Sequence, residues 1–417
     1  MEFYKFFPTP SDRMGTIWTL STIKDAYIIE FGPAGTTHFA IEGLMQLNGE
    51  HKANVYTTHI NETDISFGKQ DRLENAILEI DGQYNPKYIF VMASSISAII
   101  GTDIESICFE MQSKVSAKLI PITTGGYNGD HTLGIERSLN MLCKEVVKPS
   151  ENKQSKTYNI IGNNVDVFNF LSEMEEIKNM MKNGFDFDPN TIFTAYTSID
   201  EIEKTTMGEI NLVLRGEGLK AAKTLQKEHN MDYYYGRPYG LEGTTLWLRN
   251  LQEALGINVN EDYISKKTSE IRKHLMSYRF MIREVRNKSA ILVGDYDVVI
   301  GLANLLEELG LSIKKIIVKH KLCKEVRKYI PEKWEEIIEF NLSERELEEY
   351  LKSAPSYLLL ADGGTLKLEN QSRLHLQIAN PNFSKYSIYP YTPFVGYNGT
   401  LYMVQCLFEL EKSKSKY

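Results

Sequence analysis

The sequence predicts an α/β protein with three domains, each built on a mainly parallel sheet. Short apolar runs alternate with longer amphipathic segments along the whole chain, which is the pattern of βα units. The chain has 417 residues, more than a single hydrophobic core usually spans. Two polar breaks, KPSENKQSKT at 148–157 and RNKSA at 286–290, divide it into stretches of ordinary domain size.

The apolar runs are short enough to be strands, and amphipathic helices separate them. Helical spacing of apolar residues is clear in RLENAILEIDGQY (72–84), LEGTTLWLRNLQEALG (241–256) and VVIGLANLLEELG (298–310). We therefore expect Rossmann-like domains over residues 1–150, 155–285 and 286–417, with a ligand cavity where their strands end and the domains meet. The predicted strands are 26–29, 53–57, 88–93, 118–122, 158–161, 191–196, 212–214, 289–293, 313–318 and 357–360.

Composition excludes several classes of partner. The formal net charge is -8 and 42% of residues are hydrophobic, so we expect neither nucleic acid nor an anionic membrane surface as partner. The longest apolar stretch, YIFVMASSISAIIG at 88–101, is shorter than the about 20 residues of a membrane span. The N-terminal segment lacks the continuous apolar region of a secretory signal, which predicts a cytoplasmic protein.

Cysteine and glycine motifs point to no metal or nucleotide site within the chain. The four cysteines are far apart and form no C-x-x-C group, so we interpret them as buried small side chains and expect no metal site. No Walker loop is present, so any ATP must be bound by another protein. The turn FGPAGTTHFAIEG, 31–43, joins a strand to a helix and by itself suggests an anion cradle.

The motifs occur in a characteristic order. The first domain contains FGPAGTTHF, NETDISFGKQDRLENAI, MASSISAIIGTDIE and PITTGGYNGDHTLGIE; the second contains YNIIGNN, EINLVL and YYYGRPYGLEGTT; the third ends with PFVGYNGTLYMV. Over nearly the whole chain this order resembles component 1 of nitrogenase and its relatives. Those relatives include the cofactor scaffold pair, the dark-operative protochlorophyllide and chlorophyllide reductases, and the reductive cyclase of the nickel tetrapyrrole pathway.

The resemblance places hydroxyl side chains where the family has the cysteines of its interface cluster. By motif, these cysteines correspond to Ser11, Thr36, Ser95 and Thr124. Iron–sulfur clusters need thiolate ligands, and a hydroxyl is a poor substitute. The resemblance therefore implies that this chain alone holds no cluster, and that any iron–sulfur cluster is held by, or shared with, a partner subunit.

The ligands of the nitrogenase active-site cofactor are also absent. The cofactor cysteine corresponds to Arg215 and the cofactor histidine to Val395, which implies that the chain does not fix dinitrogen. A guanidinium cannot bind iron but suits carboxylate or phosphate. Arg215 either grips an anionic substrate at the three-domain junction or forms an interdomain salt bridge, and the sequence leaves both open.

Five further residues are candidates for the substrate cavity. His38 and His59 follow the first two strands and would suit proton delivery, although loop histidines often serve packing. The segment YYYGRPYG contributes Tyr235, Arg237 and Tyr239, which either line the cavity or form a tight interdomain turn.

The resemblance implies a subunit of a two-component, ATP-dependent reductase with a small-molecule substrate. Its partners would be a homologous component 1 subunit, in a heterodimer or heterotetramer, and a separate ATP-binding iron protein that supplies electrons. This chain would be the cluster-ligand-poor subunit. Two alternatives stay open: a scaffold or carrier for a metallocluster or tetrapyrrole, and a non-redox small-molecule-binding protein.

Overall fold

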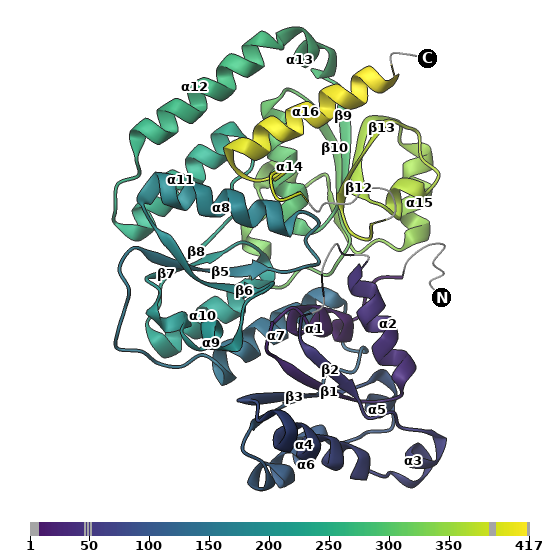
Figure 1. Cartoon of the computed structure of the whole chain (residues 1–417). Helices are drawn as coiled ribbons and strands as arrows, with labels where there is room; N and C mark the ends of the chain where they lie inside the picture. The colour runs from purple at the N-terminus through teal and green to yellow at the C-terminus, as the bar shows by residue number, and fades with distance from the viewer. Residues whose placement is uncertain (1–7, 46, 48–49, 51, 383–388, 415–417) are drawn as a thin grey trace.

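The computed structural model describes residues 8–45, 47, 50, 52–382 and 389–414. It contains three sheets, and all the strand pairs described within them are parallel. Figure 1 shows three α/β units: the first in purple and blue, the second mainly teal, and the third in green and yellow. The predicted fold class is confirmed, whereas the limits 1–150, 155–285 and 286–417 stay predictions.

The first unit has a four-stranded sheet in the order β2-β1-β3-β4. Strand β3 is buried throughout because its side chains alternate between two cores. Phe90 and Met92 point to one core, and Ile89 and Val91 to the other. The elements are β1 (Tyr27–Phe31), β2 (Asn54–Thr57), β3 (Tyr88–Ala93), β4 (Lys118–Ile122), α1 (Asp12–Leu20), α2 (Ala34–Met45), α3 (Glu62–Phe67), α4 (Asp71–Tyr84), α5 (Ser95–Ile99), α6 (Ile104–Met111) and α7 (His131–Glu145).

The second unit has four strands in the order β6-β5-β7-β8. Helix α11 follows the predicted apolar spacing: Leu241, Trp247, Leu248 and Leu251 are buried on one face, and Gly256 ends the helix in the left-handed conformation. The elements are β5 (Thr157–Asn163), β6 (Asp188–Thr194), β7 (Ile210–Val213), β8 (Tyr233–Tyr235), α8 (Phe170–Phe185), α9 (Ile199–Glu203), α10 (Leu219–His229), α11 (Leu241–Leu255), α12 (Glu261–Ser277) and α13 (Arg279–Val285).

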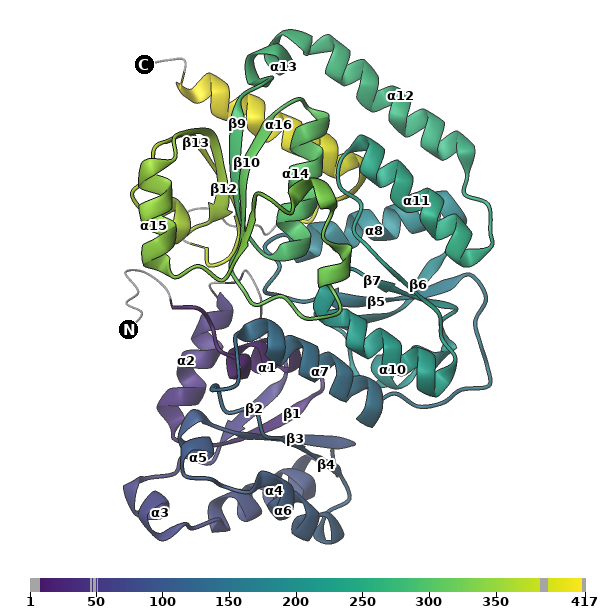
Figure 2. The same cartoon turned by 180° about the vertical axis from the view of Figure 1, so that it is seen from behind.

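The third unit has five strands in the order β11-β10-β9-β12-β13. Its last helix, α16, contacts β13 of this sheet and also packs against α8, α11 and α12 of the second unit (Figures 1 and 2). The elements are β9 (Ser289–Gly294), β10 (Ser312–Val318), β11 (Ile338–Phe340), β12 (Ser356–Asp362), β13 (Ser372–Ala379), α14 (Tyr296–Glu308), α15 (Glu344–Ser353) and α16 (Gly396–Lys414). Short 3-10 turns are η1 (Gln112–Lys114), η2 (Thr205–Met207), η3 (Gly216–Gly218), η4 (Arg327–Tyr329), η5 (Glu332–Trp334) and η6 (Thr365–Lys367).

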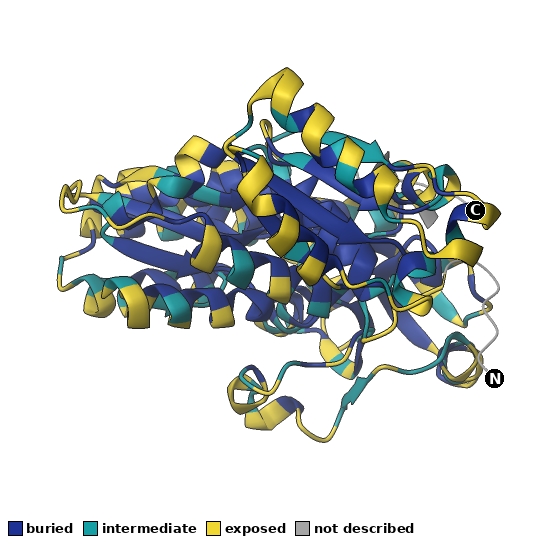
Figure 3. Cartoon of the chain, turned by 90° about the horizontal axis from the view of Figure 1, so that it is seen from below, coloured by how far each residue is buried: buried dark blue, intermediate teal, exposed yellow. Residues whose placement is uncertain are grey.

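Burial follows the layers of the three units. In Figure 3 the strands and inner helix faces are buried, and the exposed residues lie mainly on the outer faces of helices. Among the helices that the structure describes, none is both long and apolar enough to cross a membrane.

Candidate functional site

The turn after β1 packs tightly against the start of α5. A Cβ atom built on Gly32 would lie 2.4 Å from the Cβ of Ser94, so only glycine fits without movement of the chain. Ser94 is the N-cap of α5 and accepts a hydrogen bond from the Ser97 N–H at 3.1 Å. The sequence motif therefore encodes a close contact between two strand-to-helix turns.

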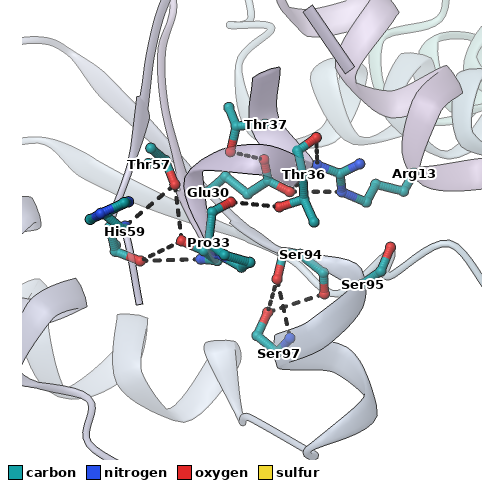
Figure 4. A network of polar contacts seen from close by, with 12 residues as sticks. Arg13, Glu30, Pro33, Thr36, Thr37, Thr57, His59, Ser94, Ser95 and Ser97 are labelled. Atoms are coloured by element: carbon teal, nitrogen blue, oxygen red, sulfur yellow. Dashed lines mark hydrogen bonds and ion pairs between the residues drawn. The ribbon is translucent and has the colours of Figure 1, made fainter. Parts of the chain in front are cut away.

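Thr36 is bound within its own turn. Its hydroxyl donates to the Pro33 carbonyl oxygen at 2.8 Å, and its own carbonyl accepts from the Arg13 guanidinium at 3.3 Å (Figure 4). Arg13 is buried and paired with Glu30, with Nε 2.7 Å from a carboxylate oxygen. Thr37 donates to the other oxygen of Glu30 at 2.5 Å. This polar network fixes the turn, and the charge of Arg13 is balanced within it by Glu30.

Two of the other predicted positions meet at Gly126. A Cβ atom built on Gly126, which has φ +98°, would lie 3.3 Å from the hydroxyl oxygens of both Ser11 and Ser95. Ser11 precedes α1, but its hydroxyl makes no capping bond. Thr124 is buried two residues before Gly126. Hydroxyl side chains from two separate segments, those of Ser11 and Ser95, therefore lie beside Gly126.

The donor set of these turns does not fit an iron–sulfur cluster. The turns offer hydroxyls, whereas the thiols lie elsewhere: Cys108, Cys143 and Cys406 are buried and Cys323 is partly buried. Burial, followed by the charge of Glu105, raises the pKa of Cys108 to about 12, which keeps that thiol protonated. No described residue of the three turns therefore supplies a thiolate for iron.

The two loop histidines lie at the surface of the first unit. His38 is 73% exposed and pairs with Glu42 at 3.0 Å. His59 is exposed, has φ +52° and donates its backbone N–H to the Thr57 hydroxyl at 3.4 Å. Neither histidine is among the described residues that line the cavity where the three units meet.

Arg215 lies in a buried ion cluster where the second and third units meet. Its Nη1 contacts both carboxylate oxygens of Asp166 at 2.7 and 2.8 Å, and its Nε contacts Glu217 at 2.6 Å. All three side chains are at least nine-tenths buried. Burial alone would raise the pKa of Glu217, but the Arg215 charge holds it below its ordinary value. Asp166, Arg215 and Glu217 all belong to the second unit, so the described ion pairs of Arg215 lie within that unit and not between domains.

A second set of charges adjoins this cluster. The Tyr235 hydroxyl donates to Asp297 at 2.6 Å, and the Gly216 N–H donates to the other Asp297 oxygen at 2.9 Å. Burial, followed by the charge of Glu217, raises the pKa of Asp297. Burial and the neighbouring Asp297 carboxylate likewise raise the pKa of Tyr235. His320 accepts a hydrogen bond from the Tyr296 N–H at 3.2 Å.

The remaining candidates are packed rather than open. Arg237 forms a buried ion pair with Glu173, and its guanidinium carbon lies 5.5 Å from the centre of the Tyr239 ring. Tyr239 and Val395 are buried. A small space of about 10 Å³, enough for about one water molecule, adjoins these residues. Arg215 and Arg237 line it, whereas the candidates Tyr235, Tyr239 and Val395 are not among its described lining residues.

A larger cavity lies at the junction of the three units. Its volume is about 80 Å³, and it opens where β9, β10, β12 and β13 end, which is the usual ligand edge of a parallel sheet. The first unit contributes α1 and α7, and the second contributes Asp166. Residues on its wall include Trp18, His131, Asp166, Asp295, Lys319, Leu342, Leu347, Asp362, Leu368 and Asn380.

Sequence reasoning predicted the place of this cavity but missed most of its lining. Three missed residues directly follow or end strands: Lys319 follows β10, Asp362 ends β12, and Asn380 follows β13. A polar residue at a strand end was the available signal. Trp18 and His131 lie in helices and carried no such signal.

Three comparisons relate the chain to known proteins. The family described as nitrogenase component 1 type oxidoreductase matches residues 11–410. The nitrogenase iron-molybdenum cofactor biosynthesis protein NifE of Clostridium pasteurianum is 27% identical over 300 residues, or 70% of this chain and 64% of that protein. The chain thus matches slightly less than two thirds of that relative's length.

A second relative and a solved structure match more of the chain. A light-independent protochlorophyllide reductase subunit of Leptolyngbya boryana is 22% identical over 418 residues, or 95% of this chain and 81% of that protein. The structure of nitrogenase Cp1 at pH 6.5 superposes with a TM-score of 0.80 at 19% identity, covering 99% of this chain and 95% of that one. This structural likeness supports the fold.

Proposed function

Because the chain belongs to the family of nitrogenase component 1 type oxidoreductases, we propose that it is the cluster-ligand-poor subunit of a two-component, ATP-dependent reductase. The observation that carries the proposal is the donor set around Gly126. The glycines of the turn motifs are present, yet hydroxyls of Ser11 and Ser95 stand at the positions matched to cluster cysteines, as do Thr36 and Thr124.

The missing thiolates imply a heteromer. A homologous component 1 subunit would supply the ligands of an iron–sulfur cluster, which this chain would border but not hold alone. A separate iron protein would bind ATP and deliver electrons, since the sequence contains no Walker loop. Around Thr36 the chain's own residues would shape the edge of the partner's site, with Arg13, whose charge is balanced by Glu30, holding the Thr36 carbonyl in place.

The substrate of this subunit would bind at the junction of the three units. Arg215 and Val395 occupy the positions matched to the nitrogenase cofactor ligands, so the proposed reaction is not dinitrogen reduction. Arg215 would act mainly by holding Asp166 in place on the cavity wall. Tyr235, Arg237, Tyr239, His38 and His59 stay candidates without a tested role.

One alternative has specific support. The relatives named nitrogenase iron-molybdenum cofactor biosynthesis proteins favour a scaffold or carrier that holds a metallocluster or tetrapyrrole without reducing it. A non-redox binding protein on the same fold is the second alternative. ATP-dependent electron transfer would distinguish the reductase from both of these alternatives.

A reconstitution tests the proposal. The chain is purified without oxygen together with a homologous component 1 subunit and an ATP-binding iron protein, and ATP hydrolysis coupled to substrate reduction is measured. We expect turnover only when all three proteins and ATP are present. ATP-independent transfer of a cluster or tetrapyrrole to another protein would instead establish the scaffold function.

A further inference from the structure

The junction cavity has a carboxylate on its wall that no described group satisfies. Asp295 directly follows β9 at the start of α14 and is half-buried. It caps no backbone N–H, and among the described residues no hydrogen-bond or ion-pair partner contacts it. Asp295 lies close enough to Arg215 for an electrostatic attraction, but the Nε and Nη1 groups of Arg215 donate their hydrogen bonds to Glu217 and Asp166. A partly desolvated carboxylate in this state favours a cationic partner.

The remaining charges of the wall do not supply that partner. Lys319 is the one cation among the described lining residues, and its ammonium lies 2.8 Å from an oxygen of Asp362. The other Asp362 oxygen accepts from the N–H groups of Gly364 and Thr365 at 2.9 and 3.0 Å. Lys319 and Asp362 therefore neutralise each other within the wall, and the charge of Asp295 is left over.

The charge balance of the cavity is negative. Apart from Glu344, which has a partner of its own, the described lining holds three carboxylates, on Asp166, Asp295 and Asp362, against the single ammonium of Lys319. Adding the buried guanidinium of Arg215 beside the wall still leaves an excess of negative charge. A concave, partly closed site with this balance attracts cations and repels anions.

The neutral parts of the wall define the rest of the ligand. The Asn380 side-chain oxygen is buried and has no hydrogen-bond donor, although its amide nitrogen donates to the Asp166 carbonyl at 3.0 Å. Leu342, Leu347 and Leu368 form an apolar side. The described wall therefore combines two acceptors and a hydrocarbon surface with two further buried polar atoms that have no partner, the Trp18 indole N–H and His131 Nδ1.

We propose that this cavity binds a small organic ammonium ion. The ammonium group pairs with Asp295 and donates to the Asn380 oxygen, while a short hydrocarbon chain packs on Leu342, Leu347 and Leu368. The inference rests on the proposed function in taking this junction as the substrate site, and it names the class of that substrate. The cavity of about 80 Å³ is smaller than the about 150 Å³ that hold benzene, so the enclosed part of the ligand has only a few heavy atoms.

The three tryptophans give a direct readout of binding. Trp18 lines the cavity, is 2% exposed, and its indole N–H has no partner. The indoles of Trp247 and Trp334 are internal controls outside the cavity, since they donate to the Gly236 carbonyl at 3.0 Å and to Asn304 at 3.4 Å. The full chain is labelled with ¹⁵N-tryptophan, and the Trp18 signal is assigned with Trp18→Phe.

The probes differ in charge but little in size. n-Propylammonium, 1-propanol and propionate are titrated separately at constant pH and ionic strength. We expect n-propylammonium alone to shift the Trp18 signal saturably, with the other two signals unmoved. An equal response to propanol or propionate overturns the proposal, as does no Trp18 response to any probe.

Variants identify the carboxylate. Asp295→Asn should weaken propylammonium binding at least tenfold, because it removes the charge and keeps the shape. Glu253→Gln removes an exposed carboxylate of α11 and should leave binding unchanged. Lys319→Met should tighten binding, because Asp362 then adds its charge to the cavity.

Unchanged affinity in Asp295→Asn, or weaker affinity in Lys319→Met, overturns the assignment. Unmoved Trp247 and Trp334 signals show that each variant is folded. The affinity for propylammonium should fall in Asp295→Asn and rise in Lys319→Met, so either variant alone tests the assignment if the other does not fold. These titrations contain neither the iron protein nor the partner subunit. A negative result therefore rejects the ammonium ligand only, and the reconstitution with both proteins tests the proposed function separately.

Discussion

Replacing Arg215 by methionine should destabilise the chain strongly. The guanidinium is the described cation that contacts both Asp166 and Glu217, at 2.7 and 2.6 Å, and all three side chains are buried. Methionine has a similar length, so the main consequence is two carboxylates left without their counter-charge in a medium that solvates them poorly.

The expected cost is about 3–5 kcal/mol, the range for removing one partner of a buried ion pair. With a urea m-value of about 2–3 kcal/mol/M, this corresponds to a midpoint lower by about 1–2 M. The neutralised variant Arg215→Met/Asp166→Asn/Glu217→Gln should recover at least about 2 kcal/mol, because no unpaired charge remains. The comparison isolates the charge effect from the loss of side-chain packing.

The stability difference between wild type and Arg215→Met should also depend on pH. Arg215 lowers the folded-state pKa of Glu217, so in the wild type this contribution is present above the ordinary value of 4.5 and is lost as pH falls through the lowered pKa. Without Arg215 that contribution is absent at every pH, so the gap between wild type and Arg215→Met should shrink below about pH 4.5. Urea unfolding at pH 7 and pH 4 measures both gaps. A cost below about 1 kcal/mol at pH 7, or a gap independent of pH, would refute this reasoning.

Two further predictions concern the turns and the buried acid. Gly32→Ala should cost about 1–3 kcal/mol because its Cβ meets Ser94, whereas Gly35→Ala, with no atom within 4 Å, should be neutral or slightly stabilising; thermal unfolding compares the two, and equal effects would contradict the packing argument. Asp297 has a raised folded-state pKa, so its contribution is complete below the ordinary value of 3.8 and is lost as pH rises. Asp297→Asn, which stays neutral, should therefore lose less stability than wild type between pH 4 and pH 8, and an unchanged slope in melting temperature would count against this.

The sequence predicted every central strand because buried strands of a parallel sheet are uniformly apolar. It missed β8, β11 and β13, each at the edge of its sheet. In β13 the apolar residues Leu374, Leu376 and Ile378 alternate with Arg373 and His375, so the run lacks the continuous apolar character that marked the other strands. Edge strands have one neighbour and tolerate polar side chains, which explains the omission.

The candidate site was predicted less completely than the fold. The order of the motifs located the turns that bring Ser11 and Ser95 to Gly126. A glycine such as Gly126, with φ +98°, marks a turn that residues with a side chain rarely adopt. The cavity wall was missed, since residues such as Trp18, His131 and Asn380 are far apart in sequence and are joined only by the arrangement of the three units. The burial that pairs Arg215 with Asp166 likewise depends on packing that a single sequence does not display.

The central claim is that the first-unit turns hold no iron–sulfur cluster by themselves. Iron and acid-labile sulfide per chain, measured on protein purified without oxygen, test it most directly. We expect neither at stoichiometric level in the isolated chain, and both in its complex with the homologous subunit. A stoichiometric four-iron cluster in the isolated chain would contradict the account.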